Sequence, residues 1–350
     1  MFNDKCLLLS LSSIITREQV LKTKVLITGA SGFIGRYLVA EALRRGYEVW
    51  AGIRATSSLK GLPDAIHCID LKYNDADVLT AQLAEHVRKN GAWDYVIHNA
   101  GLTKTTRPSD FILVNATYTH HLLMALTRAN CKPQKFVLMS SLSSYGLGDE
   151  KTFRPISPDD PQHPNTAYGK SKLLAENYVR EQSEFPYVIL RPTGVYGPGD
   201  KDYLMEIKSI RSGFDFAVGM TPQRITFIYV KDLACVVFDA LENGKILNRH
   251  YFVADGDIYT DTEFARIIQE LLQKKHVFRA RIPFWLVYIV CVLSEGIGCL
   301  IRQPMTLNTD KYKILKQRNW VCDMQPLTED LNFKPQYNLR KGLEETIAEL

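Results

Sequence analysis

Hydrophobic and polar positions divide the chain into short apolar runs separated by longer amphipathic stretches. The apolar runs have the length and β-branched content of buried strands, and the stretches between them show the spacing of surface helices. Strands are predicted at 25–27, 47–53, 65–69, 94–98, 135–139 and 187–190, and helices at 33–45, 75–89, 109–129 and 168–184. This alternation indicates an α/β fold, a doubly wound parallel sheet with helices on both faces.

The regular alternation stops after residue 190. Several residues that interrupt helices and strands follow there: Pro192, Gly194, Gly197, Pro198 and Gly199. A chain of 350 residues also exceeds one ordinary domain, so a smaller C-terminal unit is expected. The first unit should comprise 21–195 and a returning piece at about 225–241. The second should comprise 196–224 and 242–350.

Two apolar stretches lie outside this pattern. Residues 6–15 are diluted by serines and lack a clean small-residue cleavage site, so residues 1–20 are expected to be a disordered extension rather than an export signal. Residues 282–301 are almost continuously apolar, but Glu295 interrupts them, and a central charge costs ~2.5–3.5 kcal/mol on membrane-insertion scales. We therefore expect a helix in a domain core, with neither a membrane span nor membrane contact.

Composition narrows the function classes. The net charge of +5 is small for this length and has no dense basic run, so nucleic-acid binding is not expected. The seven cysteines are scattered without a C-x-x-C pair, which argues against a zinc site and against a disulfide framework. We therefore expect no bound metal ion. A reducing cytoplasm is the expected location.

A glycine-rich turn joins the first predicted strand to the first helix. Residues 28–35 read TGASGFIG, and glycines recur every three residues where the backbone must turn, approach a ligand and let helix pack on strand. The helix begins at the turn, so its first amides and its dipole favour a pyrophosphate. We predict a dinucleotide site formed by Gly29, Ser31, Gly32, Phe33, Ile34 and Gly35.

The residue after the second strand bears on the choice of cofactor. NAD enzymes place Asp or Glu there, about twenty residues after the glycines, whereas this chain has Arg54. A guanidinium pairs bidentately with a 2′-phosphate, and the hydroxyls of 56–58 add donors, so NADP is favoured over NAD. The alternative is that Arg54 stacks on adenine or faces water.

Several motifs in a fixed order carry a family resemblance. They are the glycine turn, HNAG at 98–101, YGKSK at 168–172, RPTGVYGP at 191–198 and YVKDLA at 229–234. From Lys24 to the C-terminus the chain resembles an extended short-chain dehydrogenase/reductase of the NAD(P)-dependent epimerase/dehydratase family.

The resemblance implies a Rossmann domain, a smaller C-terminal substrate-binding domain and a small-molecule substrate. Relatives commonly pack two helices across a twofold axis, so a homodimer is a further expectation. Further cofactor contacts are implied for Asp70, Leu71, Asn99, Ala100, Gly101 and Pro192.

A tyrosine and a lysine carry the catalytic interpretation. Tyr168 and Lys172 lie one helical turn apart on the same face. A cation within ~4–6 Å lowers a phenol pKa, ordinarily ~10, by ~1–3, so we expect Lys172 to bring Tyr168 toward acid/base chemistry at neutral pH. In relatives the lysine also holds the nicotinamide ribose, which makes both residues cofactor contacts.

A serine is expected to complete the site. Four serines stand after the fifth strand: Ser140, Ser141, Ser143 and Ser144. Counting back from Tyr145-Gly146, as in sugar-epimerase relatives, favours Ser141 as the catalytic hydroxyl, with Ser143 second. Asn115 matches a supporting helix position of the family.

The expected reaction is hydride transfer at a secondary alcohol or ketone, with Tyr168 as acid/base. Sugar 4,6-dehydratases carry Asp and Glu directly after the catalytic hydroxyl, but this chain has Leu142 and Ser143, which disfavours dehydration. Epimerisation of a nucleotide sugar through a transient ketone is the alternative, weakened because Arg224 sits one residue from the family's diphosphate-binding arginine. A cofactor-sensing protein without catalysis is the third interpretation.

Overall fold

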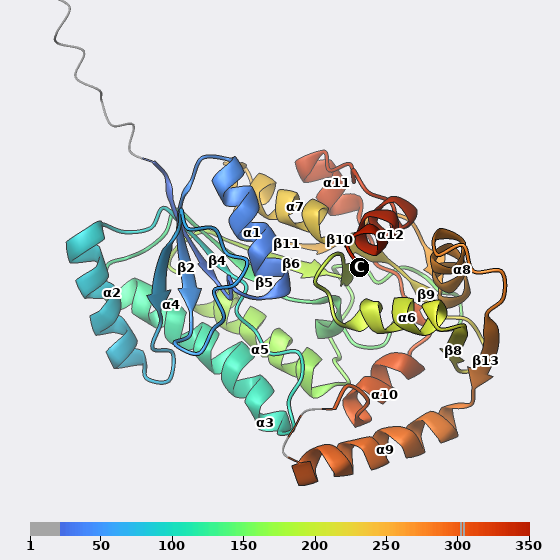
Figure 1. Ribbon diagram of the computed structural model, residues 1–350. Coiled ribbons are helices and arrows are strands. Elements are labelled where there is room, and N and C mark those ends of the chain that lie inside the picture. Colours follow the sequence, from blue (N-terminus) through green and yellow to red (C-terminus); the bar gives the residue numbers. More distant parts are fainter. Residues whose placement is uncertain (1–21, 302, 304) are drawn as a thin grey trace, which may run out of the picture.

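A seven-stranded parallel sheet forms the centre of the molecule (Figure 1). The computed structural model describes residues 22–301, 303 and 305–350, so the expected extension 1–20 lies outside the described residues. The strand order is β11-β6-β5-β4-β1-β2-β3. The strands are β1 Lys24–Thr28, β2 Glu48–Ile53, β3 His67–Asp70, β4 Tyr95–His98, β5 Lys135–Met139, β6 Tyr187–Pro192 and β11 Arg249–Val253.

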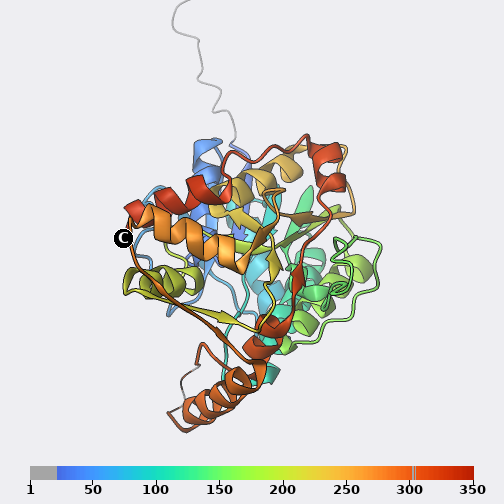
Figure 2. The same cartoon turned by 90° about the vertical axis from the view of Figure 1, so that its right-hand side faces the viewer.

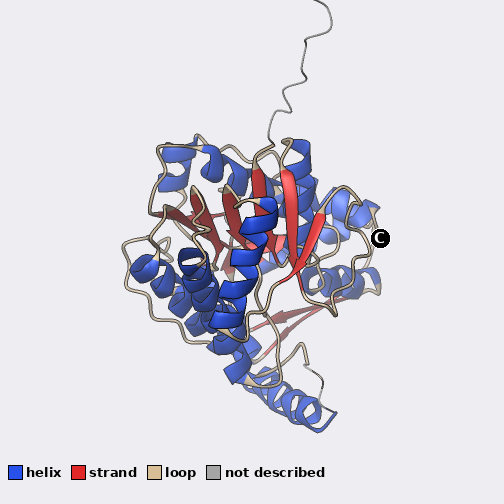
Figure 3. Ribbon diagram, turned by 90° about the vertical axis from the view of Figure 1, so that its left-hand side faces the viewer, coloured by secondary structure: helices blue, strands red, loops and turns tan. Residues whose placement is uncertain are grey.

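Helices cover both faces of this sheet (Figure 3). One face carries α1 Phe33–Arg44, α7 Val230–Glu242 and α11 Gln325–Leu331; the other carries α2 Ala76–Asn90, α4 Tyr118–Arg128 and α5 Ala167–Gln182. Along β1, Val25 and Ile27 join the core on the α1 side, whereas Leu26 joins the core on the α2 side. Because the central strands β1, β4, β5 and β6 are buried on both faces, most of their residues are apolar. The predicted doubly wound fold is confirmed.

The strand order reverses between β1 and β4. In parallel sheets such a reversal opens a crevice at the carboxyl ends of the strands, and ligands bind there. The turn Gly29–Gly32 and the start of α1 lie at this point. The predicted helix at 109–129 is divided into α3 Pro108–Phe111, the π-helix Ile112–Thr117 and α4.

Most of the other helices and strands form the second unit, on the right of Figure 1. Its helices are α6 Asp202–Arg211, α8 Asp261–Leu271, α9 Phe284–Ile301, α10 Thr309–Lys316 and α12 Leu339–Ala348. Its strands are β7 Gly194–Tyr196, β8 Phe214–Val218, β9 Arg224–Ile225, β10 Phe227–Tyr229, β12 Tyr259–Thr260, β13 Phe278–Ile282 and β14 Asn319–Trp320. The pairs β10-β7 and β13-β8 are parallel, and β9 lies between β12 and β14.

The chain crosses between the units more often than the sequence indicates. The sequence places all of 242–350 in the second unit, yet β11 lies at the sheet edge and pairs with β6 from Arg249↔Val188 to Val253↔Pro192. Its strand signal is only a short apolar run after Arg249 and His250, which explains why periodicity misses it.

The expectation of a core helix at 282–301 is wrong. In α9 only Val287, Cys291 and Gly298 are buried, and the helix projects from the body at its lower edge (Figure 2). In the part of the chain that the structure describes, α9 is the one helix whose length and composition would allow it to cross a membrane, and 17% of it is buried. A continuous apolar sequence does not distinguish a covered helix from an exposed one, because both have the same pattern.

Candidate active site

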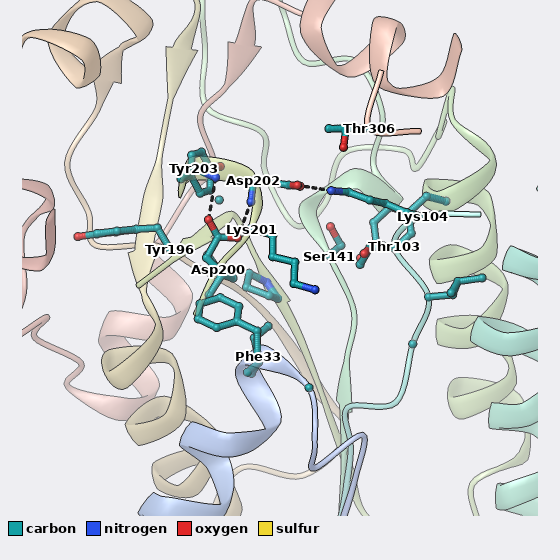
Figure 4. Close-up of a pocket in the computed structure, with 18 of the residues that line it drawn as sticks. Phe33, Thr103, Lys104, Ser141, Tyr196, Asp200, Lys201, Asp202, Tyr203 and Thr306 are labelled. Atoms are coloured by element: carbon teal, nitrogen blue, oxygen red, sulfur yellow. Dashed lines mark hydrogen bonds and ion pairs between the residues drawn. The ribbon is translucent and has the colours of Figure 1, made fainter. Parts of the chain in front are cut away.

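A large cleft lies at the carboxyl ends of the sheet strands, between the sheet and the second unit (Figure 4). Its volume is about 2230 Å³. Ligand pockets commonly have ~300–1,000 Å³, so this cleft has room for a dinucleotide and a second molecule. Residues from α1, β2, β4, β5, α5, α6 and α9 all contribute to its lining.

The glycine turn forms a cradle that side chains would fill. Gly29 has φ +67°, and a Cβ there would lie 2.9 Å from the backbone of Ala100. A Cβ on Gly35 would lie 2.1 Å from the carbonyl oxygen of Gly29. Gly29, Ser31, Gly32, Phe33 and Ile34 line the cleft, whereas Gly35 lets α1 pack against the turn. The chain therefore presents a bare backbone where α1 begins, which fits a pyrophosphate.

Two arginines, Arg36 and Arg54, line the cleft beyond the glycine turn. Arg54 follows β2 with an exposed side chain, and Arg36 in the first turn of α1 lines the cleft too. Sequence reasoning missed Arg36, although its place directly after the last glycine was a usable signal. Asp70 and Leu71 line the same end, and Asp70 forms an ion pair with Lys72.

The loop after β4 forms the middle wall. The Ala100 amide donates to Thr28 Oγ1 at 3.0 Å, and Asn99 Nδ2 donates to the Gly29 carbonyl at 3.4 Å. A Cβ on Gly101 would stand 3.2 Å from Lys172 Nζ, so the loop passes close to the predicted lysine. Pro192 lines the cleft from the end of β6.

Asn115 holds this loop in place from the π-helix. Its Oδ1 accepts the Leu102 amide at 2.6 Å, and its Nδ2 donates to the Leu102 carbonyl at 3.0 Å and to Ser171 Oγ at 2.9 Å. The π-helix thereby turns a buried amide toward both the loop and α5. Such single π turns occur frequently at functional sites.

The structure brings Ser141, Tyr168 and Lys172 together. The α5 helix begins at Ala167 because Thr166 caps it, with Thr166 Oγ1 accepting the Gly169 amide at 2.9 Å. Ser141 hydrogen-bonds to Tyr168, and Lys172 Nζ lies 5.9 Å from the centroid of the Tyr168 ring. Lys172 Nζ also donates to the Met139 carbonyl at 2.8 Å, which directs the ammonium group to the end of β5.

The four serines after β5 have different partners. Ser140 donates to Glu176, and Ser144 accepts from Gln162 at 3.3 Å. Ser141 and Ser143 line the cleft, and the Ser143 amide donates to Ser141 Oγ at 3.2 Å. Of the two cleft serines, the bond to Tyr168 distinguishes Ser141.

Burial controls the charges of the tyrosine and the lysine. Desolvation raises the pKa of Tyr168 to about 12, and the hydrogen bond from Ser141 opposes it only in part. The expectation that Lys172 lowers the pKa of Tyr168 below its ordinary value is wrong, because desolvation of the phenolate outweighs the neighbouring groups. Burial also lowers the pKa of Lys172 to about 8, against the attraction of Glu176. At pH 7 the phenol is therefore protonated and the lysine charged.

A buried ion pair lies behind the lysine. Glu176 and Arg191 are both fully buried, with Arg191 Nη2 2.8 Å from Glu176 Oε2 and Arg191 Nε 3.0 Å from Oε1. Burial raises the pKa of Glu176, but Arg191, together with Ser140 and Arg180, outweighs this effect and lowers it to about 2. Arg180 also pairs with Glu176 at 2.8 Å. The pair joins α5 to β6 directly behind the site.

Charged residues also connect the walls of the part of the cleft around Lys104, Asp202 and Lys311, which we call the outer cleft (Figure 4). Lys104, after β4, forms an ion pair with Asp202 at the start of α6, and Lys311 of α10 lies 3.8 Å from the same carboxylate. Sequence reasoning missed these residues because they are distant in the chain and belong to no motif. Arg224 is absent from the lining of the cleft and lies over the Phe153 ring at 4.5 Å.

The motif at 229–234 serves the fold. Asp232 is buried, and its Oδ2 accepts the amides of Gln336 and Tyr337 at 3.0 and 2.9 Å. Within the described residues, no group of three or more His, Cys, Asp or Glu side chains could hold a metal ion.

The parallel sheet, the glycine cradle and the tyrosine–lysine pair on α5 define an extended short-chain dehydrogenase/reductase. A family model described as the NAD dependent epimerase/dehydratase family matches residues 25–254. The chain belongs to this family.

Among its relatives are enzymes of different reactions. Human dTDP-D-glucose 4,6-dehydratase is 27% identical over 289 residues, 76% of this chain and 78% of the relative. A 3 beta-hydroxysteroid dehydrogenase/Delta 5-->4-isomerase of Mycobacterium tuberculosis (strain CDC 1551 / Oshkosh) is 29% identical over 263 residues, 71% of this chain and 69% of the relative.

The fold also matches the crystal structure of the Thermus thermophilus UDP-glucose 4-epimerase in complex with NAD, with a TM-score of 0.72. This match has 21% identity and covers 93% of this chain and 98% of that one. Because dehydratases are among the relatives, family membership does not exclude dehydration.

Proposed function

We propose that the protein is an NAD(P)-dependent oxidoreductase that acts on a secondary alcohol or ketone. The observation that supports this most strongly is the contact of Ser141 and Lys172 with a protonated Tyr168 inside the cleft. When bound, the nicotinamide supplies or accepts the hydride. Its phosphates would lie at the glycine cradle and its nicotinamide ribose beside Lys172.

The side chains supply the proton chemistry. In the reduction direction the Ser141 hydroxyl orients the carbonyl oxygen, and Tyr168 donates its phenolic proton as that oxygen gains negative charge. The Lys172 ammonium then stabilises the phenolate that remains. In the oxidation direction the same groups act in reverse.

Dehydration remains disfavoured in this proposal. Water elimination requires an acid for the leaving hydroxyl and a base for a carbon-bound proton. The two residues after Ser141 are the buried Leu142 and the hydroxyl-bearing Ser143, neither of which is a carboxylic acid.

We further propose that NADP is preferred over NAD. Arg36 and Arg54 line the same end of the cleft, and no carboxylate directly follows β2. Two guanidinium groups would attract a 2′-phosphate, whereas a carboxylate would repel it.

A nucleotide-sugar epimerase is the second candidate, favoured by the cleft volume and by a UDP-glucose 4-epimerase among the similar structures. The position of Arg224 outside the cleft weighs against it, because this side chain then contributes no charge toward a diphosphate.

The test is a substrate screen with purified protein, followed by one substitution. Absorbance of the reduced nicotinamide is recorded against panels of ketones, alcohols and sugar nucleotides. Tyr168→Phe should abolish turnover of the substrate found and leave cofactor affinity nearly unchanged, because it removes one hydroxyl and little volume. The control is Tyr178→Phe on the same helix, whose ring stacks on His120 at 4.6 Å and is absent from the cleft lining.

Full turnover by Tyr168→Phe would refute the acid/base assignment. Interconversion of sugar nucleotides without net change in cofactor absorbance would establish the epimerase instead. Tight cofactor binding with no turnover across all panels would favour the sensing interpretation.

A further inference from the structure

The only charged side chain of α9 points toward the rest of the protein, where it contacts α10. Glu295 is the single charged residue of Phe284–Ile301, and its Oε2 accepts the Thr309 amide at 3.0 Å at the start of α10. The buried positions Val287, Cys291 and Gly298 lie on the same side, at helical spacing. The remaining circumference of α9 therefore carries no charge.

That circumference is apolar and exposed. Ten large side chains of α9 are exposed: Trp285, Leu286, Tyr288, Ile289, Val290, Val292, Leu293, Ile297, Leu300 and Ile301. Leu300 reaches 84% exposure. Monomeric soluble proteins rarely leave so many neighbouring apolar side chains in water without a binding role.

A second exposed apolar face lies on β8 and β13, and two of its residues line the same cleft as residues of α9. On the β8–β13 ribbon, Phe214 and Phe216 are exposed with ring centroids 6.0 Å apart, and Phe278 packs against both. Asp215 and Arg279 form an ion pair with each other at 3.0 Å, so the charged positions alternate with the phenylalanines. Phe214 and Phe216 line the same cleft as Leu286 and Val290 of α9.

We propose that α9, together with Phe214, Phe216 and Phe278, docks in the plane of a lipid bilayer. The apolar circumference would enter the acyl boundary, while α10 and the body remain in water. Trp285 and Tyr288 lie at one end of α9, and aromatic rings of this kind concentrate at membrane interfaces.

The topology excludes a spanning arrangement for this fold. After α9 the chain returns to the body, where β14 pairs with β9 and α12 packs on α8. Both ends of α9 thus lie on the same side of any bilayer that its exposed face contacts. A span would separate β14 and α12 from their partners.

Charge favours a bilayer over a second copy of the chain. Exposed basic residues stand on the elements around the apolar surface: Lys208 and Arg211 on α6, Lys274 and Lys275 before β13, and Lys316 on α10. Anionic headgroups attract such residues. A specific protein interface would in turn need polar anchors, about one hydrogen bond per 100–200 Å², which the exposed face of α9 does not offer.

Docking would also place the outer cleft beside the lipid. Leu286, Val287 and Val290 line the cleft and belong to α9. If the protein has the proposed oxidoreductase function, an apolar alcohol or ketone dissolved in the bilayer reaches the site without crossing water. The docking itself does not depend on that function.

The experiment is flotation of the full chain with vesicles, one set of phosphatidylcholine and one that also contains phosphatidylglycerol. The wild-type protein should float with both and more strongly with the anionic set. Leu293→Glu combined with Ile297→Glu should weaken vesicle binding by about tenfold or more, because two exposed apolar side chains become charged. The control Val78→Glu alters another exposed apolar residue, on α2, which is distant from α9 in Figure 1, and this variant should float as wild type.

Cofactor binding, measured on each variant, shows whether the fold survives and is independent of docking. Wild-type protein that stays with the dense fraction, or the double variant floating as wild type, would overturn the proposal. A wild-type dimer that the double variant converts to monomer, without vesicle binding, would identify a second copy as the occupant and refute lipid docking. Protection of the chain beyond residue 301 from external protease would indicate a span and refute it as well.

Discussion

Removal of Glu176 should destabilise the protein strongly, although this residue does not line the cleft. Glu176 is fully buried and holds Arg191, Arg180, Ser140 and Gln162. Replacing it with leucine, Glu176→Leu, removes the partner of the fully buried Arg191 guanidinium. A buried charge left without a partner is more costly than the pair was favourable.

The pKa of Glu176 allows the magnitude to be worked out. Its pKa falls from an ordinary value of ~4.3 to about 2, which corresponds to ~3 kcal/mol in favour of the folded state with the carboxylate charged. This contribution is fully present above pH ~4.3 and is lost as the pH falls through about 2. Breaking one member of a buried pair typically costs ~3–5 kcal/mol, so the two routes agree.

The assay is urea unfolding at neutral pH, followed by circular dichroism, on Glu176→Leu, Arg191→Met and the double variant. Each single variant should lose ~3–5 kcal/mol, and the double variant should lose less than the sum, because no buried charge then lacks a partner. The control is Glu85→Leu on the surface of α2, which pairs with Arg88 and Lys89 in solvent and should leave the midpoint nearly unchanged. Additive losses, or a single-variant loss below ~1 kcal/mol, would refute this reasoning.

Three further predictions concern the site. Arg54→Asp should reverse a preference for NADPH over NADH in calorimetry, and equal wild-type affinities would remove the argument from Arg54. Ser141→Ala should slow turnover by ~10²–10³ while Ser143→Ala slows it less, with the reverse order showing that the wrong serine was chosen. Because burial lowers the pKa of Lys172 to about 8, the rate of reduction at saturating cofactor should fall as the pH rises through that value, and a flat profile from pH 7 to about 9 would contradict it.

Much of the sheet and of the cleft could be predicted from the sequence, because these features depend on local patterns. The glycine turn and the spacing of Tyr168 and Lys172 are encoded within single elements, so their geometry follows from the sequence once strand and helix are recognised. The pKa of Tyr168 could not be predicted in this way, because it depends on burial, and burial depends on loops contributed by distant segments. Likewise Asp202 meets Lys104 across 98 positions in the sequence, and no periodicity describes such a contact.

The exposure of α9 could not be predicted either. Its apolar sequence is compatible with a core, a membrane or an interface, and only the surroundings distinguish them. Glu295 is misleading in the sequence alone, since one charge in an apolar helix suggests core packing. In the structure that charge caps α10 and leaves the rest of the helix bare.

The place of β11 at the edge of the sheet has a consequence for synthesis on the ribosome. The sheet cannot be completed until residue 253 has emerged, and until then β6 is an open edge with unpaired backbone groups. Between β6 and β11 the ribosome must synthesise α6 and β8, which belong to the second unit, and α7, which packs on one face of the sheet. Exposed edges in nascent chains promote aggregation. A fragment that ends before Arg249 should therefore be a poor folding unit, even though it contains the glycine turn and all three residues of the predicted catalytic set.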